Sequence, residues 1–198
     1  MKISEAKFVC SSTRVTQKPK QKLPEFAFIG RSNVGKSSLI NTLCNNSSLA
    51  KTSSTPGKTK LVNHFMINGE WYLVDLPGYG YAKLGAKSRS ELSAVIKDYI
   101  SNSEEMVMLF VLVDSRHDIG AIDLDFINNL GEQGIPFAII YTKCDKQGPN
   151  VLKEQLERNE KVLGETWDEL PVQFVSSSQD KRGREEILNY IESILQTI

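Results

Sequence analysis

The feature that most constrains this chain is the run Gly30-Arg-Ser-Asn-Val-Gly-Lys-Ser37, which has the pattern G-x-x-x-x-G-K-[ST]. A short apolar segment over 26–29 precedes the run, and a helical stripe follows it at Leu39, Ile40, Leu43 and Cys44. The glycines let the backbone curve so that several N–H groups point at phosphate oxygens, and the helix dipole adds positive potential there. A strand, this loop and a helix, in that order, predict a P-loop fold.

Each position of the run has an expected role towards a bound nucleotide. Lys36 is expected to neutralise the β- and γ-phosphates and to act in catalysis, and the Ser37 hydroxyl is expected to bind Mg²⁺. The other positions are expected to surround the phosphates with backbone groups: Gly30, Arg31, Ser32, Asn33, Val34 and Gly35.

A second motif follows about 40 residues later, where the apolar run 71–74 ends in Asp75-Leu-Pro-Gly78. Asp75 is placed to lie behind the water shell of Mg²⁺, and the Gly78 amide to meet a γ-phosphate in binding and catalysis. Leu76 and Pro77 are expected to line the same site.

A third motif, Thr142-Lys-Cys-Asp145, ends the apolar run 137–141 and is similar to the N/T-K-x-D element of GTPases. The Asp145 carboxylate can accept the N1 and 2-amino protons of guanine, whereas adenine would leave a carboxylate there unpaired. Lys143 is expected along the base plane, with Thr142 shaping the loop and Cys144 packed behind it. After the last apolar run, a backbone N–H for guanine O6 is expected within Val175, Ser176 and Ser177, with the register of the serines open by one residue.

Apolar runs alternate with helical patterns along most of the chain. Six strands are expected at 26–29, 64–67, 70–74, 106–113, 137–141 and 172–175, and Asn68-Gly69 predicts a hairpin that makes one strand antiparallel. Helices are expected after the P-loop and at about 88–100, 123–133, 150–163 and 184–196. The fold class is α/β: a Ras-like G domain of the P-loop NTPase class, with a six-stranded, mostly parallel sheet and helices on both faces.

Charge divides the chain into two parts. The 198 residues have no net charge, but residues 1–22 hold six basic residues and one acidic residue, a net charge of +5. We predict a basic, irregular arm over 1–22, with RNA contact or solubility as its role, and one G domain over 23–198. Residues 45–60 and 77–87 are expected to be flexible, and His64 and His117 to be surface or strand-edge residues rather than ligands.

The composition favours a reduced, cytoplasmic protein. No apolar run approaches 18 residues, the N-terminus has no apolar signal segment, and the three cysteines have neither disulfide parity nor metal spacing. Two other functions remain to be weighed. A metabolic P-loop kinase would need an acceptor pocket and an arginine-bearing lid, and a lipid-anchored membrane-traffic GTPase would need a C-terminal cysteine, which the ending Leu195-Gln-Thr-Ile lacks.

Together with Ser53-Ser-Thr-Pro-Gly-Lys-Thr59 and Asp75-Leu-Pro-Gly-Tyr-Gly-Tyr81, these motifs make residues 22–195 resemble the EngB/YsxC/YihA family of ribosome-biogenesis GTPases. The resemblance implies a monomeric GTP/GDP switch in assembly of the large (50S) ribosomal subunit, with rRNA and ribosomal proteins of its precursor as partners. It also implies a role in cell division and septation.

The resemblance also assigns residues in the polar loop. Thr59 matches the switch I threonine that binds Mg²⁺ and acts in catalysis, with Thr52 and Thr55 as alternatives. The nucleotide is expected to be lined by Gly57, Lys58, Thr59, Lys60 and Leu61. Asn33 matches an asparagine that some relatives use to hold K⁺. Tyr79 stands where many GTPases have a water-orienting glutamine, which implies slow hydrolysis.

Overall fold

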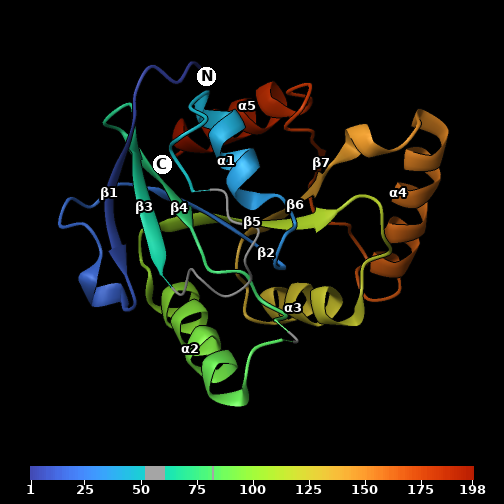
Figure 1. Cartoon of the computed structure of the whole chain (residues 1–198), viewed down its shortest axis with the longest axis horizontal. Helices are drawn as coiled ribbons and strands as arrows, with labels where there is room; N and C mark the ends of the chain where they lie inside the picture. Colours follow the sequence, from blue (N-terminus) through green and yellow to red (C-terminus); the bar gives the residue numbers. More distant parts are fainter. Residues whose placement is uncertain (52–60, 82) are drawn as a thin grey trace.

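The computed structural model describes residues 1–51, 61–81 and 83–198, which form one seven-stranded sheet between two layers of helices (Figure 1). The strand order is β1-β3-β4-β2-β5-β6-β7. The strands are β1 (Ala6–Ser12), β2 (Glu25–Gly30), β3 (Val62–Ile67), β4 (Trp71–Asp75), β5 (Met106–Asp114), β6 (Phe137–Thr142) and β7 (Gln173–Val175).

The sheet confirms the expected direction of its strands but not their number. β3 is antiparallel to both of its neighbours, β1 and β4, and the pairs from β4 to β7 are all parallel. β3 is therefore the one strand that runs against the other six, as predicted. The expected count of six strands is wrong, because β1 adds a seventh.

β1 comes from the segment that the sequence predicts to be an irregular arm. It lies at the edge of the sheet and is held by backbone pairing with β3, so it needs no alternating apolar pattern. Phe8 and Val9 are 55% and 40% exposed, and the register shifts between Phe8 and Cys10. Such a bulge, with a lysine at position 7, discourages further strand pairing at this edge.

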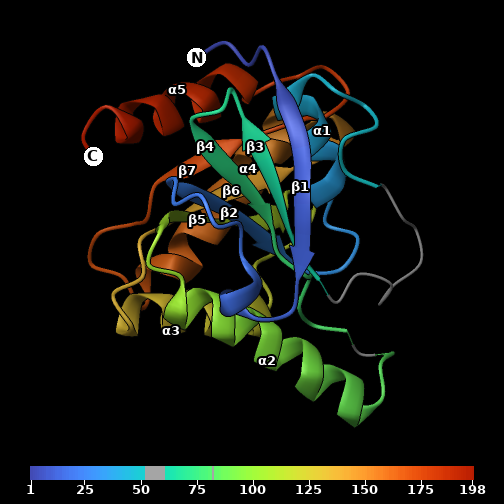
Figure 2. The same ribbon diagram turned by 90° about the vertical axis from the view of Figure 1, so that its left-hand side faces the viewer.

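The helices divide between the two faces of the sheet, as Figures 1 and 2 show. They are α1 (Lys36–Cys44), α2 (Ala86–Asn102), α3 (Ala121–Glu132), α4 (Pro149–Gly164) and α5 (Arg184–Leu195), with short 3₁₀ turns η1 (Val15–Gln17) and η2 (Cys144–Lys146). Alternate residues of β2 face opposite cores: Phe26 and Phe28 face α1 and α5, and Ala27 and Ile29 face α2, α3 and α4. Among the described residues, no helix has both the length and the apolar character that crossing a bilayer requires.

The predicted hairpin turn between β3 and β4 is confirmed. Asn68 and Gly69 have φ angles of 52° and 68°, the left-handed region that a type I′ turn requires at both positions. The Asn68 side chain also accepts hydrogen bonds from the backbone N–H groups of Ser4 and Glu5 at 2.9 and 3.1 Å. The turn therefore fastens the start of the N-terminal segment.

A buried ionic network around Glu25, the first residue of β2, joins the N-terminal segment to the sheet. Glu25 is 1% exposed and accepts hydrogen bonds from the hydroxyls of Tyr99 (2.6 Å) and Ser103 (2.9 Å). It also pairs with Lys18 at 2.8 Å and lies 3.2 Å from Nε2 of His64, which is fully buried. The expectation that His64 lies at the surface or a strand edge is wrong, because a carboxylate inside the sheet gives this imidazole a buried partner.

The network makes stability depend on pH. Burial alone would raise the pKa of Glu25, but hydrogen bonds with His64, Lys18 and Tyr99 outweigh it and lower the pKa from 4.5 to about 2. The folded state therefore binds this proton less tightly than the unfolded chain does. The stabilisation from the ionised carboxylate is complete above pH 4.5 and is lost as the pH falls towards 2.

We predict that Lys18→Met lowers the free energy of unfolding at pH 7 by about 3–5 kcal/mol, because it leaves Glu25 buried without its cation. Urea denaturation measures the change. The control is Lys20→Met, which removes the same charge from an exposed position and should change stability by less than about 0.5 kcal/mol. Equal stability of the two variants would show that the buried pair does not hold this segment.

Candidate functional site: the P-loop cleft

The P-loop lies between β2 and α1 and depends on its glycines. Gly35 caps α1 with a φ of 100°, and Asn33 has a φ of 61°, so the loop curls back over the helix N-terminus. A Cβ added to Gly30 would lie 2.8 Å from Cγ1 of Val34 and 2.9 Å from the carbonyl oxygen of Leu112. The resulting turn leaves the first N–H groups of α1 unpaired by the helix itself, which suits an anion.

Lys36 and Asp75 meet inside this turn. Asp75 ends β4, which pairs in parallel with β2, and is 6% exposed. The Lys36 ammonium donates a hydrogen bond to its carboxylate. Ser37 and Asp75 line the same cleft, so a hydroxyl, a carboxylate and an ammonium converge at the carboxyl edge of the sheet, where open α/β sheets bind ligands.

The second motif continues from β4 along the P-loop. Leu76, which is fully buried, donates its N–H to the Phe28 carbonyl at 3.0 Å, and Tyr79 donates its N–H to the Gly30 carbonyl at 3.0 Å. A Cβ on Gly78 would lie 3.1 Å from the Gly30 carbonyl oxygen and 3.3 Å from the Ser32 nitrogen. Glycine therefore allows the two backbones to approach, and the Gly78 N–H has no acceptor among the described residues.

The third motif is bonded directly to the P-loop. The Thr142 hydroxyl donates to the Val34 carbonyl at 2.6 Å, and the Lys143 ammonium donates to the Asn33 carbonyl at 2.7 Å. Lys143 has a left-handed φ of 61°, which ends β6 and turns the chain into η2. The residue types of this motif thus have a structural use as well as the expected contact with a base.

Asp145 lies beside the serine loop that follows β7. The Ser177 hydroxyl donates to the Asp145 carboxylate at 2.8 Å, and Ser176 donates its N–H to the Tyr141 carbonyl at 2.7 Å. Burial would raise the pKa of Asp145, but the Ser177 hydrogen bond and the nearby Lys146 lower it overall, so the carboxylate is ionised at neutral pH. Cys144 is fully buried, as predicted, and donates its N–H to the Ser176 carbonyl at 3.1 Å.

The cleft has a volume of about 780 Å³. The predicted residues that line it are Ser32, Asn33, Val34, Gly35, Lys36, Ser37, Leu61, Asp75, Pro77, Gly78 and Lys143. Gly30, Leu76, Thr142, Cys144, Asp145, Val175, Ser176 and Ser177 support or flank it without lining it. The predicted residues Thr52, Thr55, Gly57, Lys58, Thr59 and Lys60 lie outside the described part of the chain.

Two findings differ from the expected site. Phe8 and Ser11 of β1 line the cleft, and sequence reasoning missed them because it did not recognise this strand. Residues 45–50, the start of the loop predicted to be flexible, form a turn that is hydrogen bonded to α1. The Asn41 side chain donates to the Ser47 and Ala50 carbonyls and accepts from the Ala50 N–H, which fastens this turn to α1.

The three motifs lie within the region that is similar to a known protein family, except for the last two residues of the third. A family model described as 50S ribosome-binding GTPase matches residues 25–143. A probable GTP-binding protein EngB from Phocaeicola vulgatus is 56% identical over 198 residues, covering all of this chain and 99% of the relative. The chain belongs to the EngB family. It is therefore a GTP-binding protein of the ribosome-binding GTPases, a family whose activity is GTP hydrolysis.

Other relatives support the EngB assignment over the whole chain. A probable EngB from Porphyromonas gingivalis is 55% identical, with 100% and 98% of the two chains covered. A crystal structure of a probable EngB has a TM-score of 0.66 at 23% identity, covering 88% of this chain and all of that one. A structure of Era with MgGDPNP and part of 16S ribosomal RNA has a TM-score of 0.67 at 22% identity, covering 88% of this chain and 56% of Era. These structures show that the fold is shared.

We predict that Gly183→Ala disrupts the serine loop. Gly183 has a φ of 78°, and a Cβ there would lie 2.1 Å from the Val175 carbonyl oxygen, so the backbone that carries Ser177 must move. We expect weaker binding of a fluorescent GDP analogue, by roughly tenfold or more, because Ser177 holds Asp145.

Gly134→Ala is the matched control for this substitution. Its φ of 66° imposes the same strain, about 1–2 kcal/mol for a left-handed residue, but nothing lies within 4 Å of the added Cβ. Unchanged GDP binding by both variants would mean that the loop position does not affect the base site.

Proposed function

We propose that this EngB-family protein is a guanine-nucleotide switch with slow GTP hydrolysis that acts in assembly of the large ribosomal subunit. Its role in normal cell division and septation is part of the proposal, as are a monomeric state and a cytoplasmic location. The observation that carries the proposal is the joining of three separate motifs at one cleft. Thr142 bonds to Val34, Lys143 to Asn33, and Tyr79 to Gly30.

In this proposal the P-loop residues 30–37 surround the phosphates and Asp145 reads guanine. The ionised Asp145 carboxylate, oriented by Ser177, accepts the N1 and 2-amino protons, while adenine offers an acceptor at N1. Backbone groups within 175–177 face O6, and Lys143 lies along the base. Lys36, Gly78 and Thr59 stabilise the charge that develops on the γ-phosphate.

Mg²⁺ fits the donor set of the cleft. The Ser37 hydroxyl and the Asp75 carboxylate are hard oxygen donors that line the cleft, and Asp75 is nearly buried. No group of three or more His, Cys, Asp and Glu within the described residues could hold a metal alone, which suits an ion held partly by phosphate oxygens and water. Ser37 and Thr59 would hold Mg²⁺, and a K⁺ ion beside Asn33 would add positive charge near the phosphates.

The position of Tyr79 supports slow hydrolysis. Its hydroxyl donates to Asp123 at 2.7 Å, and its ring stacks on Phe126 with centroids 4.6 Å apart. The side chain lies against α3 and does not line the cleft. A residue in this position orients no attacking water, so the protein relies on charge stabilisation or on a partner.

We predict that Asp145→Asn weakens GTP binding by on the order of 100-fold, because a charge-assisted pair is lost and amide donors face guanine donors. Xanthosine triphosphate, which has an acceptor in place of the 2-amino group, should bind the variant better than GTP does. Titration with fluorescent nucleotides measures both affinities.

Asp168→Asn is the control, since it removes a carboxylate from an exposed position that does not line the cleft. GTP affinity of Asp145→Asn within about threefold of the wild type would refute the assignment of Asp145. Tight ATP binding without GTP binding by the wild-type protein would instead favour a P-loop kinase.

The ribosomal contact is proposed at the basic residues that follow the second motif. Lys83, Lys87 and Arg89 are exposed; Lys83 precedes α2 and the other two lie in its first turn, so their presentation depends on the state of Gly78. The N-terminal segment contributes less free charge than its sequence implies. Lys18 pairs with Glu25 and Glu105, and Lys22 lies 3.4 Å from Glu105.

We predict that the triple substitution Lys83/Lys87/Arg89→Ala weakens GTP-dependent co-sedimentation with the large-subunit precursor. It should also flatten the log–log salt dependence by roughly 0.7–0.9 per lost phosphate contact, while GTP binding stays intact. The matched control, Lys153/Arg158/Lys161→Ala, removes the same charge from exposed positions on α4. Wild-type affinity of the first variant across the salt series would place the contact elsewhere.

A further inference from the structure

The segment after Gly78 is attached to α3 by one side chain. Tyr79 donates its hydroxyl to Oδ1 of Asp123 at 2.7 Å, and its ring stacks on Phe126 at an interplanar angle of 23°. Both partners lie on α3, in its first two turns. Burial raises the pKa of the Tyr79 hydroxyl, so it stays protonated and can donate this hydrogen bond.

The carboxylate of Asp123 is buried, so its charge needs hydrogen-bond donors close by. It is 6% exposed, and burial raises its pKa, although the Tyr79 hydroxyl and the nearby Arg31 oppose that shift. Loss of a hydrogen-bond donor to a buried carboxylate costs free energy, so the Tyr79–Asp123 contact is favoured over separation.

The backbone of Tyr79 is attached to the P-loop at the same time. Its N–H donates to the Gly30 carbonyl at 3.0 Å, and Tyr79 forms a parallel bridge with Arg31. The Arg31 side chain turns away from the cleft: its Nε lies 3.2 Å from a Cβ added to Gly80, and its Nη1 lies 3.9 Å from one added to Gly120. The P-loop, the second motif and the start of α3 are thus joined around Tyr79.

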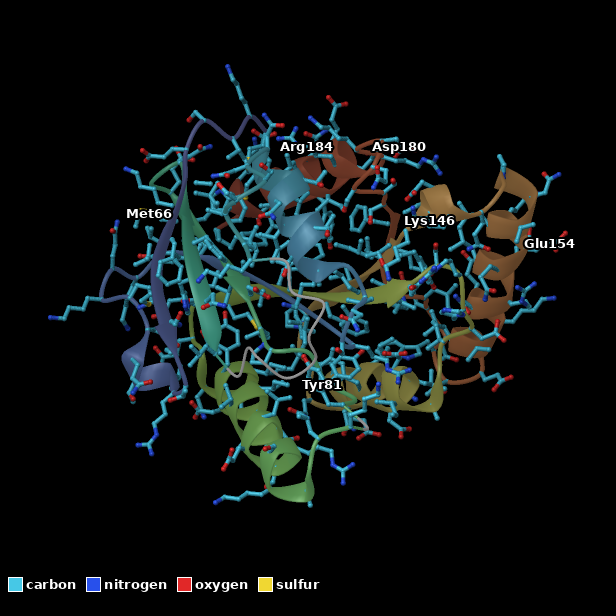
Figure 3. The ribbon with its side chains drawn as sticks, viewed as in Figure 1. Met66, Tyr81, Lys146, Glu154, Asp180 and Arg184 are labelled. Atoms are coloured by element: carbon cyan, nitrogen blue, oxygen red, sulfur yellow. The ribbon has the colours of Figure 1, made fainter. Side chains whose placement is uncertain are left out.

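Tyr81 connects this unit to the cleft. It lines both the P-loop cleft and a second cavity of about 380 Å³ against α2 and α3, and its hydroxyl lies 3.2 Å from a Cβ added to Gly78. Figure 3 labels Tyr81 at this end of the molecule, close to α3. Gly78 therefore has the P-loop on one side and Tyr81 on the other, and Tyr79 is the next residue along the chain.

We propose that Tyr79 is a positioning residue: by docking on Asp123 and Phe126, it holds the Gly78 N–H at the phosphate end of the cleft. This docking raises the affinity for a nucleoside triphosphate relative to that for the diphosphate, because only the triphosphate reaches Gly78. The inference rests on the proposed function as a guanine-nucleotide switch. Tyr79 stands where many GTPases have a water-orienting glutamine, and the inference gives it a role in nucleotide sensing rather than in water activation.

The test is Tyr79→Phe, which keeps the ring on Phe126 and removes only the hydroxyl. We expect its affinity for a non-hydrolysable GTP analogue to fall about tenfold, the size typical for loss of a hydrogen bond to a charged group, while GDP affinity changes less than about twofold. Isothermal titration with each nucleotide gives the ratio of the two affinities, which a general loss of stability would not change.

Two further variants separate positioning from folding. Tyr99→Phe also removes a buried tyrosine hydroxyl from a carboxylate, at Glu25 on the far side of the molecule, and should leave the ratio unchanged. Asp123→Asn keeps an oxygen acceptor for Tyr79 and should leave the ratio of the two affinities near the wild-type value, whereas Asp123→Leu should lower the affinity for the triphosphate relative to the diphosphate. This second pair carries the test if Tyr79→Phe does not fold.

The outcomes distinguish the inference from the proposed function beneath it. If the wild-type protein binds neither GDP nor the GTP analogue, both fail. In a second outcome, the wild-type protein binds both nucleotides while Tyr79→Phe leaves the ratio of the two affinities unchanged. In that case Tyr79 is only a structural residue, and the inference alone is overturned.

Discussion

The close approach of two backbones at the carboxyl edge of the sheet controls the rest of this structure. Residues 78–79 lie against the P-loop because β2 and β4 are adjacent parallel strands and because Gly78 has no side chain to separate them. The Tyr79 N–H bonds to the Gly30 carbonyl across this junction. Any movement of one segment must therefore be accommodated by the other, which is the mechanical requirement for a nucleotide-sensing switch.

The opposite end of the sheet has a buried charge network in addition to its backbone hydrogen bonds. Glu25 gathers Lys18, Tyr99 and Ser103 around one buried carboxylate. These partners come from the N-terminal segment and from the C-terminal end of α2, the helix whose start follows the second motif. One end of α2 is thus anchored, so a change at the cleft can displace mainly its other end.

The motifs predicted more of this protein than the periodicity did, for physical reasons. In the proposed function, phosphate binding demands glycine at Gly30 and Gly35, and base reading demands a carboxylate at Asp145, so chemistry restricts these positions whatever surrounds them. β1 carries no such restriction. An edge strand is held by backbone hydrogen bonds to β3, which any residue except proline can make, so Phe8 and Val9 gave no alternating signal.

The sequence by itself determined the fold class, the order of the elements from β2 onward, the antiparallel β3 and the three cleft motifs, because local periodicity and fixed spacing encode them. Only the tertiary structure decided what the isolated polar residues do. His64 and Lys18 are ordinary surface types in sequence, yet they surround Glu25, 39 and 7 residues away along the chain. Tyr79 likewise acquires its partner Asp123 only when α3 packs against the segment that follows β4, since long-range contact leaves no trace in local spacing.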